Sequence, residues 1–127
     1  MAERKQIIVL DDNATFLRSV ERVLQVHGFD VETFDTVDGF LGGARLGYAT
    51  CLVLDIHLNG TSGIDVRRRL TLSGLSLPVI FMTGDDNEAT RTAALETGCV
   101  AYLRKPSPSS HLIGAIDQIG ARNMATS

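Results

Sequence analysis

The chain has 127 residues with a formal net charge of −3, and 44% of them are hydrophobic, which is enough for one domain around a single core. Its 12 lysines and arginines are scattered, whereas a nucleic-acid surface needs clustered positive charge, so we expect no direct nucleic-acid contact. No apolar run reaches membrane-spanning length and residues 1–6 lack a signal-peptide core, so we expect a cytoplasmic protein without membrane contact.

Short continuous apolar runs alternate with segments whose apolar residues recur at helical spacing. The short runs have the length and apolar character of strands that are buried on both faces of a sheet. Caps frame the helices, because Asp12 or Asn13 can begin the first one and Gly28 can end it. In chain order, we predict a strand at 7–10, a helix between Asn13 and Gly28, a strand at 31–34, a helix at about 37–46, a strand at 51–54, a helix at about 64–72, a strand at 79–82, a helix ending at Gly98, a strand at 100–103, and a helix capped by Ser107 that runs from Pro108 to Gly120.

Five strands alternating with five helices predict right-handed crossover connections and a parallel sheet that is covered on both faces. The fold class is therefore α/β, a doubly wound and flavodoxin-like five-stranded sheet with strand order 2-1-3-4-5. We expect a single domain over residues 1–127, with its core at about 6–120 and a frayed tail at 121–127.

Charged and hydroxyl side chains stand where four of the apolar runs end: Asp11 and Asp12, Asp55, Thr83, and Lys105. Because the carboxyl ends of parallel strands meet at one edge of a sheet, we expect these five side chains to converge where the strand order reverses. Three neighbouring carboxylates repel one another, and each partly desolvated charge needs a partner. The pattern therefore predicts a divalent cation site beside an ammonium and a hydroxyl, an arrangement suited to phosphate chemistry.

Four fragments of the chain carry a resemblance to a known family. They are VLDD at 9–12, LDI at 54–56, PVIFMTG at 78–84 and YLRKP at 102–106. In this order and at these separations, the chain resembles the receiver domain of bacterial two-component response regulators, closest to receivers that are often joined to helix-turn-helix output domains. The resemblance covers Ile7 to about Ile119.

The resemblance implies a phosphoacceptor signalling domain that is not an enzyme, although it promotes its own phosphorylation and dephosphorylation. Asp55 would accept a phosphoryl group from the phosphohistidine of a sensor histidine kinase or a phosphotransfer protein. Mg²⁺, or Mn²⁺, would be held by Asp11, Asp12, Asp55 and the backbone carbonyl of His57.

The resemblance also implies a conformational switch. Lys105, expected before a cis bond to Pro106, would pair with Asp55 and then with a phosphoryl oxygen. The Thr83 hydroxyl would hydrogen-bond the phosphoryl group, and the Tyr102 ring would rotate into the space that Thr83 leaves. These movements would change the face formed by the fourth helix, the fifth strand and the fifth helix, which would control an output domain or partner and could form a homodimer.

Two further polar residues stand close to the predicted site. His57 and Asp85 each lie two residues past a site residue, beside the path that water would take to the phosphoryl group. We hypothesise that they modulate the rate of dephosphorylation.

Three alternatives remain open. A phosphatase of the haloacid-dehalogenase kind, which uses an aspartate nucleophile after the first strand, would need a second acid two residues later, and neither Asn13 nor Ala14 supplies it. A flavodoxin-like mononucleotide binder would need a phosphate-cradling loop where this chain has two anions. A receiver-fold module that binds proteins without being phosphorylated would keep the fold. The presence of all five site residues argues against this alternative.

Overall fold

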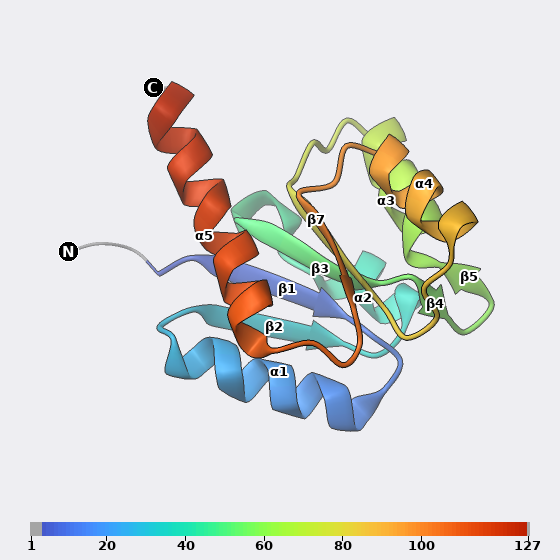
Figure 1. Cartoon of the computed structure of the whole chain (residues 1–127), viewed down its shortest axis with the longest axis horizontal. Helices are drawn as coiled ribbons and strands as arrows, with labels where there is room; N and C mark the ends of the chain where they lie inside the picture. Colours follow the sequence, from blue (N-terminus) through green and yellow to red (C-terminus); the bar gives the residue numbers. More distant parts are fainter. Residues whose placement is uncertain (1–3, 127) are drawn as a thin grey trace.

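The computed structural model describes residues 4–126, and the side chains from 4 to 119, as a five-stranded parallel sheet with helices on both faces (Figure 1). The strand order is β2-β1-β3-β6-β7, so the first strand lies between the second and the third in sequence. This confirms the predicted α/β fold and its 2-1-3-4-5 topology. The main strands are β1 (Gln6–Leu10), β2 (Asp30–Phe34), β3 (Cys51–Asp55), β6 (Val79–Thr83) and β7 (Ala101–Arg104), and the helices are α1 (Ala14–Val26), α2 (Val37–Gly43), α3 (Gly63–Leu72), α4 (Glu88–Glu96) and α5 (Ser109–Thr126).

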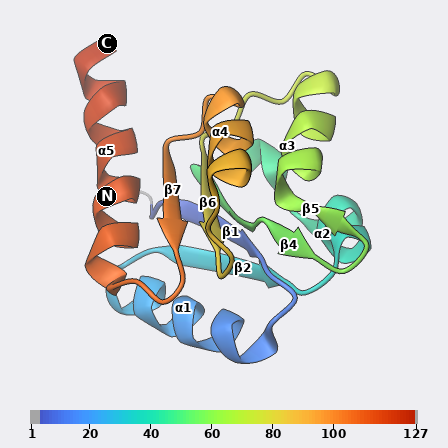
Figure 2. The same ribbon diagram turned by 45° about the vertical axis from the view of Figure 1, so that its right-hand side comes forward.

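Two apolar clusters sandwich the sheet, one beneath each layer of helices. Helices α1 and α5 cover one face, and α2, α3 and α4 cover the other, as the rotated view in Figure 2 also shows. Strand β1 serves both clusters, since Ile7 and Val9 face α1 and α5 while Ile8 and Leu10 face the opposite layer. This period-two alternation explains why the central strands read as continuous apolar runs. Among the described residues, no helix combines the length and apolarity that crossing a bilayer would require.

The structure decides one boundary that the sequence left open and corrects two others. The side chain of Asn13, rather than Asp12, caps α1 by accepting a hydrogen bond from the Phe16 N–H at 3.0 Å. Helix α2 ends at Gly43 instead of about residue 46, because two consecutive glycines lower its helix propensity, and the short 3₁₀ helix η1 (Leu46–Tyr48) follows.

The last helix differs from the prediction at both ends. It begins at Ser109, one residue later than expected, and it continues past Gly120 to Thr126. The backbone of residues 121–126 is helical, the frayed tail expected from residue 121 stays a prediction, and Ser127 lies outside the described residues. A glycine costs a helix only about 1 kcal/mol, and the alanines, arginine and methionine that follow are good helix formers.

A small hairpin between β3 and α3 was absent from the prediction. Strands β4 (His57–Leu58) and β5 (Thr61–Ser62) pair antiparallel around the two-residue turn Asn59-Gly60. Gly60 has a φ of +78°, the left-handed conformation that such tight turns require. Asn-Gly is a strong hairpin signal, but strands this short lack the alternating pattern that normally accompanies it.

Helix α3 begins immediately against the strand end that carries Asp55. A Cβ atom on Gly63, the first residue of α3, would lie only 2.3 Å from the carbonyl oxygen of Asp55. The Gly63 N–H also donates to the Ile56 carbonyl at 2.9 Å, which ties the helix start to the end of β3. The missing side chain therefore permits the close approach that positions the backbone of Asp55.

We predict that Gly63→Ala destabilises the fold by about 1–3 kcal/mol, because the new methyl group must displace the backbone of Asp55 or the start of α3. Gly114→Ala is the matched control, since Gly114 lies within α5 and an added Cβ meets no atom within 4 Å. That control should be stabilised by about 0.5–1 kcal/mol. Urea unfolding of both variants measures the two effects, and equal stabilities would contradict the close approach.

Candidate functional site

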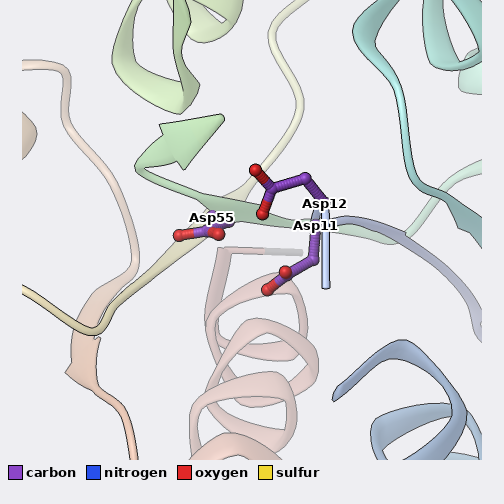
Figure 3. Close-up of side chains that lie close together, drawn as sticks. All are labelled: Asp11, Asp12 and Asp55. Carbon is purple, nitrogen blue, oxygen red and sulfur yellow. The ribbon is translucent and has the colours of Figure 1, made fainter. Parts of the chain in front are cut away.

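Three carboxylates gather beyond the carboxyl ends of neighbouring strands (Figure 3). The pairing of Leu10 with Leu54 places Asp11 and Asp55, the residues that follow them, at the same edge of the sheet. Oxygens of Asp11, Asp12 and Asp55 lie within 4.8 Å of one another. This is where the strand order reverses, between β1 and β3, so the structure brings the three acidic residues together as the sequence predicted.

The acidic pocket formed by Asp11, Asp12 and Asp55 combines two buried carboxylates with one exposed carboxylate. Asp11 and Asp55 are only 1% and 6% exposed, whereas Asp12 faces solvent. Burial raises the pKa of Asp55 above its usual range, and the neighbouring charge of Asp11 raises it further, against the opposing effect of Lys105. A cation among these oxygens would offset both effects, and carboxylate oxygens are the ligands that hard divalent ions prefer. The residues present therefore fit a divalent metal site.

Lys105 lies between the two buried carboxylates. Its ammonium forms ion pairs with the Oδ2 atoms of Asp11 and Asp55, the latter at 3.4 Å. The contact with Asp11 is the shorter one, whereas the sequence had assigned Lys105 to Asp55 alone. The residue follows β7 directly, its N–H donates to the Thr83 carbonyl at 2.7 Å, and its peptide bond to Pro106 is cis, as expected.

Each buried carboxylate gives one oxygen to the backbone and the other to the ammonium. The Asn13 N–H donates to Asp11 Oδ1 at 2.9 Å, and the His57 N–H donates to Asp55 Oδ1 at 3.2 Å. The Oδ2 atom of each carboxylate forms the ion pair with Lys105. These contacts orient both carboxylates before any ligand arrives.

Thr83 is fully buried at the end of β6, and its hydroxyl is engaged by the following loop. The hydroxyl accepts from the Asp85 N–H at 3.1 Å and lies 3.2 Å from the Asp85 carbonyl, to which it can donate. A cavity of about 450 Å³ opens beside it, lined by residues 83–86 and 104–106. A Cβ on Gly84 would meet no atom within 4 Å, so there is room here for a further group.

Tyr102 is half-buried on β7 and is held by a residue that the sequence did not single out for this role. Its hydroxyl donates to Asp86 Oδ1 at 2.8 Å, while Asp86 Oδ2 pairs with Arg91 at 2.9 Å and with Arg104 at 3.8 Å. The hydrogen bond from Tyr102 lowers the pKa of Asp86, and burial together with Asp86 raises the pKa of Tyr102 to about 12. The sequence placed Asp86 only near the start of the fourth helix, because no local pattern reports a partner 16 residues away.

His57 and Asp85 lie beside the pocket with exposed side chains. His57 belongs to the small hairpin after Asp55, and Asp85 to the loop after Thr83. The His57 N–H donates to Asp55 and the Asp85 backbone contacts the Thr83 hydroxyl, so each residue is joined to a predicted site residue, and their effect on a dephosphorylation rate stays a prediction.

Comparisons with known proteins agree on one family. The family model of the response regulator receiver domain matches residues 7–117 of this chain. The response regulator protein TodT of Pseudomonas putida is 32% identical over 117 residues, which cover 91% of this chain and 52% of TodT.

Solved structures resemble the chain over most of its length. The response regulator StyR superposes with a TM-score of 0.84 at 30% identity, covering 98% of this chain and 65% of StyR. A response regulator from Burkholderia pseudomallei, solved with a phosphorylated aspartic acid, a calcium ion and citrate, has a TM-score of 0.75 at 25% identity and covers 97% of this chain and 75% of its own.

The chain spans about half the length of the curated relatives it matches. The family match nevertheless extends over nearly the whole fold and includes all three acidic residues, Thr83 and Lys105. The chain belongs to the family of response regulator receiver domains, which are signalling modules rather than catalytic enzymes.

Proposed function

We propose that Asp55 accepts a phosphoryl group from the phosphohistidine of a sensor histidine kinase or a phosphotransfer protein. The observation that carries this proposal is the buried Asp55 carboxylate, within 4.8 Å of two other carboxylates and 3.4 Å from the Lys105 ammonium. An Asp55 oxygen would bond to phosphorus while the bond from phosphorus to the histidine nitrogen breaks, and that nitrogen would leave with the electron pair. The similar Burkholderia structure with a phosphorylated aspartic acid supports this assignment.

We propose that Asp11, Asp12, Asp55 and the backbone carbonyl of His57 hold Mg²⁺, or Mn²⁺, in the acidic pocket. When bound, the ion would supply positive charge that stabilises the phosphoryl oxygens. The chain's own contribution is orientation, because backbone N–H groups already fix Asp11 and Asp55. Lys105 would supply a point charge that moves from the carboxylates to a phosphoryl oxygen.

The switch that follows phosphorylation would begin at Thr83. For its hydroxyl to donate to a phosphoryl oxygen, it must give up its present contacts with the Asp85 backbone. The neighbouring Asp86 holds the Tyr102 hydroxyl, so movement of this loop would free the ring to turn toward Thr83. The face formed by α4, β7 and α5 would then change and control an output domain, a partner, or a homodimer.

We predict that incubation with acetyl phosphate and Mg²⁺ adds one phosphoryl group to the wild-type protein, detected by intact mass. Asp55→Asn should abolish the addition because the amide is not a nucleophile. Asp117→Asn, which alters an exposed aspartate on α5, is the control and should be phosphorylated normally.

Other outcomes would contradict this function. Steady release of phosphate from many substrates would indicate a phosphatase, and copurified flavin would indicate a mononucleotide binder. A folded wild-type protein that gains no phosphoryl group would indicate a module that binds proteins without being phosphorylated.

We predict that Asp55→Asn stabilises the metal-free protein at neutral pH. Folding raises the pKa of Asp55, so the favourable contribution of its protonated form is complete below the ordinary value of 3.8 and is lost as the pH rises through the raised value. Thermal unfolding in EDTA should show a higher midpoint for Asp55→Asn than for wild type at pH 7, and a smaller gain near pH 4. A gain that is constant across this range, or equal to that of Asp117→Asn, would contradict the electrostatic origin.

We predict that His57→Ala and Asp85→Ala each change the lifetime of the acyl phosphate by at least about threefold, because both exposed side chains would flank the path of the attacking water. The lifetime is measured from the loss of the phosphorylated mass after the donor is removed. His27→Ala provides a control, since His27 contacts the Val23 carbonyl at the far end of α1. Unchanged lifetimes in both variants would discard the assignment.

A further inference from the structure

The side chain of Phe16, on the first turn of α1, lies against the ammonium of Lys105. The nitrogen stands 4.1 Å from the centroid of the ring, within the range of a cation–π contact. The Lys105 side chain is 19% exposed, so water screens this contact only in part. The helical pattern alone assigns Phe16 to the apolar stripe of α1 and predicts no contact with the acidic pocket.

We propose that Phe16 is a positioning residue that holds the Lys105 ammonium beside Asp55, a role that rests on the proposed phosphorylation of Asp55. A closed ring of contacts supports it. The Asn13 N–H donates to Asp11, the Phe16 N–H donates to the Asn13 side chain, the Phe16 ring contacts Lys105, and Lys105 pairs with Asp11. The cap of α1 thus places the aromatic ring at a set distance from the carboxylate that shares its ammonium.

The ring would matter most when the pocket carries a cation. A metal ion on Asp11 would compete with Lys105 for that carboxylate and weaken the ion pair that now holds the ammonium. The face of an uncharged ring attracts the ammonium without competing for the metal. Phe16 would then keep Lys105 within reach of Asp55 and of the incoming phosphoryl oxygens.

A purely packing role is the alternative, because Phe16 also touches the apolar cluster beneath α1 and α5. Two substitutions separate these roles. Phe16→Leu keeps an apolar side chain but removes the ring face, whereas Phe16→Tyr keeps the ring. Phe29→Leu is the control, because it makes the same change in the same apolar cluster. Phe29 directly precedes β2, which is the edge strand opposite to β7, the strand that Lys105 follows.

The contact can be measured by NMR without any phosphorylation. The sequence contains two lysines, Lys5 and Lys105, so a sample with ¹³C-labelled lysine gives two ε-methylene signals, and Lys5→Arg assigns them. The ring current of Phe16 should shift the Lys105 signal upfield in the metal-free protein. We expect this shift to be lost in Phe16→Leu and retained in Phe16→Tyr and Phe29→Leu, with Lys5 as internal reference.

The functional consequence is measured as the rate of phosphorylation by acetyl phosphate with saturating Mg²⁺. We expect Phe16→Leu to be about two- to fivefold slower than wild type, and Phe16→Tyr and Phe29→Leu to match it. If the Lys105 signal is unchanged in Phe16→Leu, or if Phe16→Leu is phosphorylated as fast as Phe29→Leu, then the positioning role of Phe16 is overturned and the proposed function of Asp55 is not affected. Absence of phosphorylation in the wild-type protein would instead overturn the proposed function and, with it, the reason for the positioning.

Discussion

The ammonium of Lys105 lies between the carboxylates of Asp11 and Asp55 and keeps two buried like charges together. Without it, desolvation and mutual repulsion would favour protonation of one carboxyl group or separation of the strand ends. The two carboxylates lie close together because parallel strands place their carboxyl ends side by side. Backbone N–H groups of Asn13 and His57 then stabilise the remaining carboxylate oxygens. The result is a negatively charged pocket with oriented ligands, whose charge a divalent cation could balance.

Close backbone packing supports this pocket from below. Gly63 lets α3 begin against the carbonyl of Asp55. The hairpin of β4 and β5 connects Asp55 to Gly63 along the chain. On the other side, the N-terminal cap of α1 connects Asp11 to Phe16 and so to Lys105. Elements that look like ordinary connections are therefore part of the geometry that holds the three charged groups.

A separate polar cluster links the pocket to the surface around α4, β7 and α5. Thr83 bonds to the backbone of Asp85, and the next residue, Asp86, holds the hydroxyl of Tyr102 together with Arg91. A displacement of the loop after β6 would affect both contacts, because adjacent residues make them. Such a pair of neighbouring contacts is a physical route by which the proposed change at Asp55 would reach a distant face.

The amino-acid pattern alone determined the α/β fold and the meeting of Asp11, Asp12, Asp55, Thr83 and Lys105 at one edge of the sheet, whereas the strand order was one of the common doubly wound orders and was confirmed by the structure. The pattern could do so because apolar runs mark buried strands and parallel strands end together. The tertiary structure decided that Asn13 caps α1, that Gly63 must lack a side chain, that Lys105 lies closer to Asp11 than to Asp55, and that Phe16 and Asp86 contact Lys105 and Tyr102. The contacts of Lys105 and Tyr102 join residues far apart in the chain and depend on rotamers and distances of a few ångströms. Periodicity specifies which face a residue occupies, but it does not specify which side chain it meets there.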